Sequence, residues 1–378
     1  MLVLYIIPYK WGGLSHYTME LANAASKYAE VVVITPKGFS DCSANNRIKI
    51  MEIIDAPEFS TDKPLKAFLP GNWRCFAPSY NLKKIIDGIK PDIIHLTTLL
   101  VPPLISTLIF YRIDRKYPII ITKHGIFSDS GGFTRILESG LLYFEKMIPF
   151  QHTIVHNQKD RETLINRGNH QQSKISVIPH GVYSFFTSLN TQFTAERNCI
   201  LFFGYIKPYK GLEYLLKAVP IVAKRIQGLK VIIAGEGDMS PYESLLLTNS
   251  DVEFEIYNEF VSNEKAAEFF QRAEIVVLPY SIMRSGQSGI LHIAFAFNKP
   301  VVATHVGGIP EAVEDGKTGF IVIPRDEIAL AQRIIMLLND DNLRKEMSRN
   351  IEKTVGNISW DVVARKTIDI YKKVAGVV

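Results

Sequence analysis

The chain of 378 residues has few cysteines and no apolar run long enough for a membrane span. Its three cysteines, Cys42, Cys75 and Cys199, are scattered and odd in number, which argues against a disulfide framework and favours a reducing compartment. The N-terminus lacks the basic flank of a signal peptide. The apolar stretch Leu96–Tyr111 is shorter than the roughly 20 residues of a spanning helix, and prolines interrupt it. We therefore expect a cytoplasmic protein.

A strong charge of either sign is also absent, because the net charge is only +5. Residues 1–198 contain 22 basic and 16 acidic residues, whereas the remainder contains 21 basic and 22 acidic residues. The basic N-terminal half is consistent with an anionic partner, such as the inner face of a membrane or a phosphorylated acceptor. It is equally consistent with an ordinary solvated surface. No compact Lys/Arg run indicates a nucleic-acid groove, so nucleic acid is not an expected partner.

The length and the apolar pattern predict two α/β domains. Short strands rich in Ile and Val alternate with helices, and the first such unit (strand, glycine loop, helix, strand) implies a parallel sheet. A polar linker is expected at 183–198, and 358–374 reads as an amphipathic helix. The strands predicted before the linker are 2–7, 31–34, 92–96, 119–122, 153–156 and 175–178, and those after it are 199–203, 230–234, 275–278 and 301–303.

Three loops stand out because each follows a predicted strand and precedes a predicted helix. Paired glycines let a backbone approach a ligand closely, helix N-termini favour anions, and lysines suit a departing diphosphate. Each loop alone also fits a tight turn, a solvated loop or an ordinary capped helix. Together they favour a ligand that contains a diphosphate. The residues concerned are Gly12 and Gly13 in the first loop, Lys207 and Lys210 in the second, and Gln287, Ser288 and Gly289 in the third.

The sequence from Val301 to Val322 resembles the donor-domain signature of the family 4 retaining glycosyltransferases. It contains the turn Gly307-Gly308-Ile309-Pro310-Glu311 and the acidic stretch 314–319, which ends in Gly-Lys-Thr-Gly. Other pieces resemble the same family over nearly the whole chain, most specifically in 199–323. They are the glycine pair at 12–13, the interdomain sequence 177–182, the loop 204–211, the strand end 232–237 and Trp360.

The resemblance implies an α/β protein of the GT-B fold, with two Rossmann-like, doubly wound domains that face a cleft. The N-terminal acceptor domain would span residues 1–185 and the nucleotide-sugar domain residues 199–357. The C-terminal helix, 358–378, would cross back to the first domain. Ligands in such sheets bind beyond the carboxyl ends of the strands.

The implied activity is transfer of a hexosyl group from a nucleotide-diphosphate sugar to a glycan or lipid-linked acceptor, with retention of configuration. No metal and no other cofactor is expected. His124 and Lys210 would be catalytic, His124 through a hydrogen bond to the donor sugar. The diphosphate would contact Gly12, Gly13, Lys207, Lys210, Ser288 and Gly289. The sugar and base would contact Gln287, Tyr257 and Glu311.

The sequence departs from the family pattern where two glutamates usually stand. Those positions are Ser285 and Ile293, and the usual arginine of the second loop is Tyr205. Gln287-Ser288-Gly289 resembles a recurrent variant of the family, which favours subfamily divergence. The alternative is a non-catalytic relative that binds a nucleotide sugar or regulates a partner.

Three further patterns give weaker functional hypotheses. His152 and His156 are spaced i,i+4 but flank a strand, so a metal site there is not expected. The apolar helical segment 133–150 carries cations and could lie on a membrane surface, although a core helix fits it better. A nicotinamide enzyme is a third hypothesis, supported only by Gly235-Glu236-Gly237, and Ser240 replaces the third glycine of that fingerprint.

Overall fold

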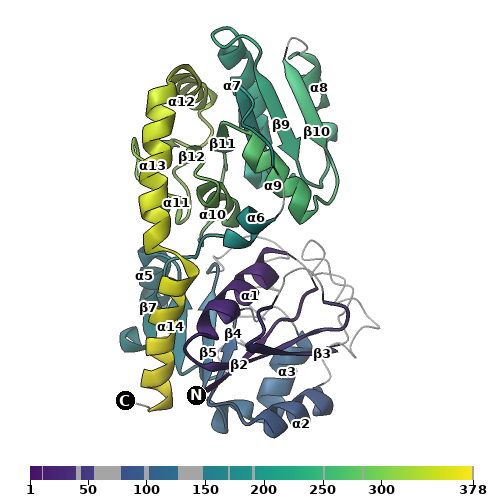
Figure 1. The fold of residues 1–378 in the computed structure, drawn as a ribbon, viewed down its shortest axis with the longest axis vertical. Helices are drawn as coiled ribbons and strands as arrows, with labels where there is room; N and C mark the ends of the chain where they lie inside the picture. Colours follow the sequence, from purple (N-terminus) through teal and green to yellow (C-terminus); the bar gives the residue numbers. More distant parts are fainter. Residues whose placement is uncertain are drawn as a thin grey trace. The chain divides into compact units, whose positions relative to one another are not determined.

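The computed structural model describes residues 1–10, 12–39, 44–54, 78–97, 102–126, 148–168, 171–189, 192–249, 252–282 and 285–376. The chain forms two compact units (Figure 1). The first contains Met1–Pro179 and Trp360–Val378, and the second contains His180–Ser359. Most of segment 133–150, together with Cys42 and Cys75, lies outside the described residues.

The described part of the first unit is built on a sheet of seven parallel strands. They are β1 (Leu2–Ile6), β2 (Glu30–Pro36), β3 (Ile48–Ile54), β4 (Ile93–Leu96), β5 (Ile119–Lys123), β6 (His152–Val155) and β7 (Ile175–Val177). Their order across the sheet is β3-β2-β1-β4-β5-β6-β7. The central strands are buried on both faces, which explains why they read as continuous apolar runs in the sequence.

Helices cover this sheet, and the C-terminal helix belongs to the same unit. The described helices are α1 (Gly13–Ala25), α2 (Tyr80–Ile89), α3 (Pro102–Phe110), α5 (Gln158–Asn166) and α14 (Trp360–Ala375), with short 3₁₀ turns at Ile113–Arg115 and Gln172–Lys174. Helix α14, yellow in Figure 1, packs against α1. Its buried side chains Val363, Ile368 and Tyr371 share one apolar cluster with Tyr17 of α1.

The second unit repeats the architecture with six parallel strands in its described part. They are β8 (Cys199–Phe203), β9 (Lys230–Ala234), β10 (Glu253–Tyr257), β11 (Ile275–Leu278), β12 (Val301–Thr304) and β13 (Gly319–Val322). The order is β10-β9-β8-β11-β12-β13. The chain therefore winds outward from β8 in both directions, and the switch point lies between β8 and β11.

Helices form a layer on each face of this second sheet. They are α6 (Ser184–Ser188), α7 (Leu212–Ala223), α8 (Glu243–Leu247), α9 (Asn263–Arg272), α10 (Gly289–Ala296), α11 (Ile309–Ala312), α12 (Glu327–Asn339) and α13 (Asp341–Asn357), with 3₁₀ turns at Pro208–Lys210 and Ser240–Tyr242. Alternation along β9 sends Val231 and Ile233 into the cluster with α7 and α12. Ile232 and Ala234 point to the cluster with α9 and α10.

Side-chain caps set where several of these helices begin. The Ser262 side chain accepts from the Lys265 N–H at the start of α9, and Asp326 and Asp340 do the same for α12 and α13. Such caps satisfy N–H groups that have no partner within the helix, at about 1 kcal/mol each. None of the described helices is both long and apolar enough to cross a membrane.

The boundary between the units differs from the one expected at residue 185. The first unit ends at Pro179, and the expected linker at 183–198 begins with a short helix, α6. Tyr183 and Phe186 are only 3% and 5% exposed and pack in the cluster of α9 and α10. The polar residues around these two rings make the segment look like a linker in the sequence. Burial of the rings makes it part of the second unit.

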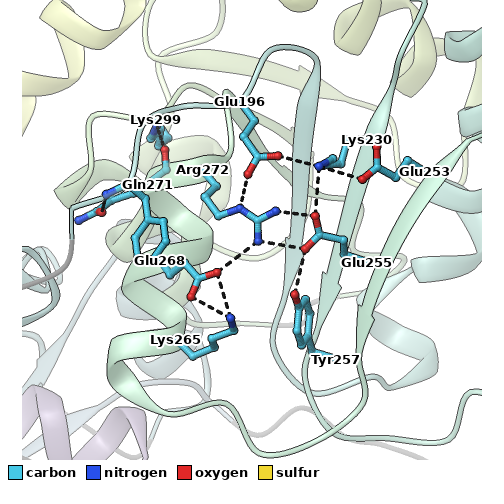
Figure 2. A network of polar contacts seen from close by, with 11 residues as sticks. Glu196, Lys230, Glu253, Glu255, Tyr257, Lys265, Glu268, Gln271, Arg272 and Lys299 are labelled. Atoms are coloured by element: carbon cyan, nitrogen blue, oxygen red, sulfur yellow. Dashed lines mark hydrogen bonds and ion pairs between the residues drawn. The ribbon is translucent and has the colours of Figure 1, made fainter.

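A network of charged residues joins β9, β10 and α9 (Figure 2). The Arg272 guanidinium, on a side chain that is 11% exposed, contacts the carboxylates of Glu196, Glu255 and Glu268. Lys230 pairs with Glu196 at 2.8 Å and with Glu255 at 3.3 Å. The hydrogen bond from Arg272 is the largest cause that lowers the pKa of Glu255 to about 2, against the opposing effect of burial.

This network predicts a stability loss at low pH. Because the folded-state pKa of Glu255 is depressed, its contribution is complete above its ordinary pKa of about 4.3 and is lost as the pH falls towards 2. We expect Glu255→Gln to lower the free energy of unfolding by about 2–3 kcal/mol at pH 7 and to flatten its pH dependence below pH 5. Urea denaturation at a series of pH values measures both effects.

Glu253→Gln is the matched control, because Glu253 lies on the same strand and its side chain is 63% exposed. Its change in stability should stay below about 1 kcal/mol at every pH. Equal pH profiles for Glu255→Gln and the unchanged protein would show that the network does not couple folding to pH.

Candidate active site

Loops that follow β8 and β11 meet at the switch point of the second unit. Lys210 ends the 3₁₀ turn after β8, and its Nζ donates to the Tyr280 hydroxyl at 2.8 Å. The same Nζ lies 4.1 Å from the centre of the Tyr280 ring. The Ser281 N–H donates to the Tyr209 carbonyl at 2.9 Å, which ties the two loops together. Lys210 is thus held at the edge where ligands bind in sheets of this kind.

A third loop completes this cluster. The Tyr280 hydroxyl lies 2.9 Å from the Oγ of Ser288, the N-cap residue of α10. The Tyr280 oxygen accepts from Lys210, and in its contact with Ser288 either hydroxyl can be the donor. Lys210, Tyr280 and Ser288 form a polar chain of one cation and two hydroxyls beside a helix N-terminus.

Tyr280 was not among the residues singled out from the sequence. It stands two positions beyond the predicted strand 275–278, at the end of that strand where ligands bind. That placement was available in the sequence, but a lone tyrosine between proline and serine carries no recognisable motif.

Glycines allow the backbones of these loops to lie in direct contact. Gly211 has φ +72°, and a Cβ there would lie 1.8 Å from the Pro279 carbonyl oxygen. Gly235, at the end of β9, has φ +145°, and its Cβ would lie 2.2 Å from the Gly204 oxygen. A side chain at Gly211 would therefore separate the loop that carries Lys210 from the loop that carries Tyr280.

Gln287 lies among histidine and tyrosine side chains. Its Oε1 accepts a hydrogen bond from His292 Nε2 at 3.0 Å. The His292 ring stacks on His180, with ring centres 4.5 Å apart and planes 18° from parallel. The Tyr183 hydroxyl lies 3.4 Å from His180 Nε2, and the Tyr183 ring lies 3.4 Å from where a Cβ on Gly289 would be. The third loop is thus packed against residues that begin the second unit.

The positions of the two missing glutamates have different surroundings. Ile293 is 7% exposed and joins the apolar core of the second unit. Ser285 is half-buried in the loop before α10. Apolar packing has replaced one carboxylate, and a small polar residue has replaced the other.

Lys207, Glu311 and Tyr257 are three further expected site residues, and each lies in a different element of the second unit. The Lys207 Nζ lies 5.6 Å from the centre of the Tyr205 ring, so a cation stands over the tyrosine at the family's arginine position. Glu311 is exposed in the first turn of α11, and the preceding Gly308 N–H donates to the Gly286 carbonyl in the third loop.

Tyr257 ends β10, which is the edge strand of the sheet. Its hydroxyl donates to Glu255 at 2.9 Å, and its ring packs on Phe269 with centres 4.5 Å apart. Tyr257 is therefore part of the Arg272 network, two strands away from β8 in the sheet order.

The other expected site residues belong to the first unit. Gly12 has φ +104° and is the N-cap residue of α1, where its carbonyl accepts from the Ser15 and His16 N–H groups. Ser15 does not cap this helix. Its hydroxyl donates to the Tyr9 carbonyl. Gly13 opens the helix.

His124 follows β5, at the carboxyl edge of the first sheet. Its Nδ1 lies 3.2 Å from His156 Nε2, and its ring meets the Tyr17 ring edge-on with centres 4.3 Å apart. His152 instead contacts Ser176 at 2.8 Å. In the described ranges, no three His, Cys, Asp or Glu side chains are grouped to hold a metal ion.

A cavity of about 670 Å³ in the second unit lies away from these loops. It is lined by Arg197, Asn198 and Arg225 and by residues 338–342, between α12 and α13. Arg197 and Asn198 precede β8, so the cavity is at the amino-terminal edge of the sheet, opposite Lys210. It is not the place where the three loops meet.

Solved structures identify the class of this fold. The sucrose-phosphate synthase of Thermosynechococcus elongatus matches with TM-score 0.74 and 19% identity, and the match covers 100% of both chains. Anabaena HepE in complex with UDP-glucose matches with TM-score 0.68 and 16% identity, over 99% of this chain and 100% of that chain. Two doubly wound sheets with these likenesses define the GT-B class.

Family models match both halves of the chain. Residues 11–183 match Glycosyltransferase Family 4, and residues 197–340 match Glycosyl transferases group 1. The chain is therefore similar to the family 4 glycosyltransferases in its first half and to the group 1 glycosyl transferases in its second half. The D-inositol 3-phosphate glycosyltransferase of Corynebacterium diphtheriae is 27% identical over 237 residues, 58% of this chain and 55% of that protein. The chain spans about half the length of the curated relatives it matches, from 40% to 57%.

The contact at Gly211 predicts a large effect of one methyl group. Gly211→Ala must strain a left-handed backbone and displace Pro279, so we expect about 3 kcal/mol or more of destabilisation. Gly228→Ala is the control, because Gly228 has φ +65° but open space around its Cβ, and the loss there should be about 1 kcal/mol. Denaturant midpoints measure both. Equal losses would mean that the close approach adds no constraint.

Proposed function

We propose that this protein transfers a hexosyl group from a nucleotide-diphosphate sugar to a glycan or lipid-linked acceptor, with retention of configuration and without a metal ion. The observation that carries the proposal is the chain from Lys210 through Tyr280 to Ser288, where the loops of β8, β11 and α10 meet. The matches of both halves to glycosyltransferase families support glycosyl transfer. The UDP-glucose bound to Anabaena HepE, a protein of the same fold, supports a nucleotide-sugar donor.

Lys210 has the central role in this proposal. Breaking the bond between sugar and diphosphate leaves negative charge on the leaving phosphate oxygen, and a fixed cation stabilises that charge as it develops. Tyr280 restrains the lysine through one hydrogen bond and its ring face. The cation is therefore positioned before the substrate arrives, which reduces the reorganisation required during the reaction.

The remaining diphosphate contacts follow from the same arrangement. Ser288 offers its hydroxyl proton, and the N–H groups at the start of α10, including that of Gly289, offer further donors. Lys207 would add a second cation, and Gly12 and Gly13 would approach the donor from the first unit. Gln287 and Glu311 would contact the sugar, His124 would accept from one of its hydroxyls, and Tyr257 would lie at the base.

A non-catalytic nucleotide-sugar-binding protein is the second candidate. The observation that favours it is the replacement of both family carboxylates, one by the buried Ile293. It shares the donor site with the first candidate, and turnover separates the two. A contact of the basic N-terminal half with the inner face of a membrane remains part of the proposal.

Substitution of Lys210 tests the proposed chemistry. We expect Lys210→Ala to reduce turnover by about 10²-fold or more, which is the usual effect of removing one charge-stabilising donor. Tyr280→Phe should fall between this variant and the unchanged enzyme, because the cation keeps its aromatic contact but loses its hydrogen bond. Initial rates of nucleoside diphosphate release measure all three proteins.

Lys217→Ala is the matched control for lost positive charge, because Lys217 lies on α7 and pairs with the exposed Glu213. Its turnover should be unchanged. Near-normal turnover of Lys210→Ala would refute the role given to Lys210.

Nucleotide binding tests the donor site without a known acceptor. A ligand present at about 100 times its dissociation constant adds about 2.7 kcal/mol of stability. We therefore expect a clear thermal shift with one family among UDP, GDP, ADP, TDP and their sugars, and none with NAD. A shift without transfer to any acceptor in a broad panel would favour the non-catalytic candidate. No shift with any nucleotide would overturn both.

A further inference from the structure

Two histidines stand side by side at the carboxyl edge of the first sheet. Strands β5 and β6 pair in parallel with Lys123 opposite Val155, so the residues that follow, His124 and His156, are neighbours. His156 Nε2 lies 3.2 Å from His124 Nδ1. His156 Nδ1 lies 2.9 Å from the carbonyl oxygen of Ile178. These contacts form a line from backbone to His156 to His124.

The protons along this line have one consistent arrangement. A carbonyl oxygen only accepts, so His156 Nδ1 must carry a proton. Burial lowers the pKa of His156 to about 4, so near neutral pH its ring holds that one proton and Nε2 has a lone pair. The contact at 3.2 Å then requires His124 Nδ1 to donate.

The second ring follows from the first. Desolvation by burial, and after it the nearby His156 and His95, hold the pKa of His124 well below its usual range, so its ring is also neutral. With the proton on Nδ1, the lone pair is on Nε2. Any group that pairs with His124 Nε2 must therefore be a donor.

Aromatic rings fix the orientation of both imidazoles. Tyr17 meets His124 edge-on and lies 5.3 Å from the His156 ring, measured between centres. Trp360, the first residue of α14, also packs on Tyr17, with ring centres 5.0 Å apart. The C-terminal helix therefore contributes to holding the pair in place.

We propose that His156 is a positioning residue that fixes the proton of His124 on Nδ1, so that His124 Nε2 accepts a hydrogen bond from a hydroxyl group of the donor sugar. This rests on the proposed function for the identity of the ligand. His124 then acts as a neutral hydrogen-bond acceptor and has no proton to give at Nε2. The arrangement selects a sugar with a hydroxyl at the contacted position over one that lacks it, because a hydroxyl supplies the donor that Nε2 requires.

Ring nitrogen NMR of the full-length enzyme labelled with [15N]histidine tests the proton arrangement directly. We expect His124 to show a protonated Nδ1 and an unprotonated Nε2 near neutral pH, with His124→Asn used to assign its signals. A protonated Nε2 on His124 would overturn the proposal. This result does not depend on any substrate.

Two substitutions at position 156 separate positioning from simple packing. His156→Phe keeps a ring but removes the acceptor, so the fixed tautomer of His124 should be lost. His156→Gln supplies an amide oxygen in place of Nε2 and should restore it. His152→Gln is the control on the same strand, because His152 contacts Ser176, and His124 should be unchanged in that variant.

Activity gives the second readout, with the same panel of UDP-, GDP-, ADP- and TDP-sugars. We expect His156→Phe to lose about tenfold in kcat/KM, the effect of about one hydrogen bond, and His156→Gln to recover most of it. Equal losses in both variants would assign His156 a packing role and overturn the proposal. If the unchanged protein responds to no nucleotide sugar, the sugar contact fails with the proposed function, whereas the NMR result decides the tautomer separately.

Discussion

The contact between Gly211 and the Pro279 carbonyl is the constraint on which the donor-side arrangement depends. Parallel strands bring all their carboxyl ends to one edge, but this alone leaves neighbouring loops several ångströms apart. The absent Cβ lets the loop after β8 lie directly on the loop after β11. Lys210 is therefore brought within hydrogen-bonding distance of Tyr280, and Tyr280 reaches Ser288. One glycine thus allows the loop of Lys210 to contact the loop of Tyr280, which is 70 residues away in the sequence.

Side chains at the carboxyl edge of the first sheet are held in place in a different way. The histidines near this edge are buried and are linked by hydrogen bonds, such as the one between His124 and His156. His95 contacts Thr122 at 2.8 Å and Tyr371 of the C-terminal helix, and burial lowers its pKa to about 3. A protonated His95 would be an uncompensated charge in the core, so these buried groups are linked by hydrogen bonds between neutral partners. The second unit instead concentrates its charge in the Arg272 network.

Much of the fold could be predicted from the sequence, because the buried parallel strands are short runs of Ile and Val and agree with the structure to within one or two residues. Three strands are missing from the predicted set, β3, β10 and β13, and all three lie at sheet edges. The exposed faces of β3 and β10 carry charged residues such as Lys49 and Glu253. The motifs also singled out Lys210 and Ser288, both of which contact Tyr280 in the structure. They could not indicate Tyr280 or His156, because the partners of these residues are set by strand register and loop contact, which no local pattern records.

The replacement of the two family glutamates changes which interactions are available to bind a sugar donor in the second unit. With Ile293 in the core, the described loops around Lys210 present a cation, hydroxyls, an amide and stacked imidazoles. A carboxylate near a diphosphate binds hydroxyls strongly but also repels the phosphates. In the proposed donor complex, the positive charge of Lys210 would act on the diphosphate without this repulsion, and neutral groups such as Gln287 would recognise the sugar. Neutral hydrogen bonds are weaker than charged ones, so more of them are needed for the same selectivity. That requirement favours a site in which the hydrogen-bond donors and acceptors of the protein are fixed before the ligand binds. The proposed tautomer of His124 in the first unit is such a case.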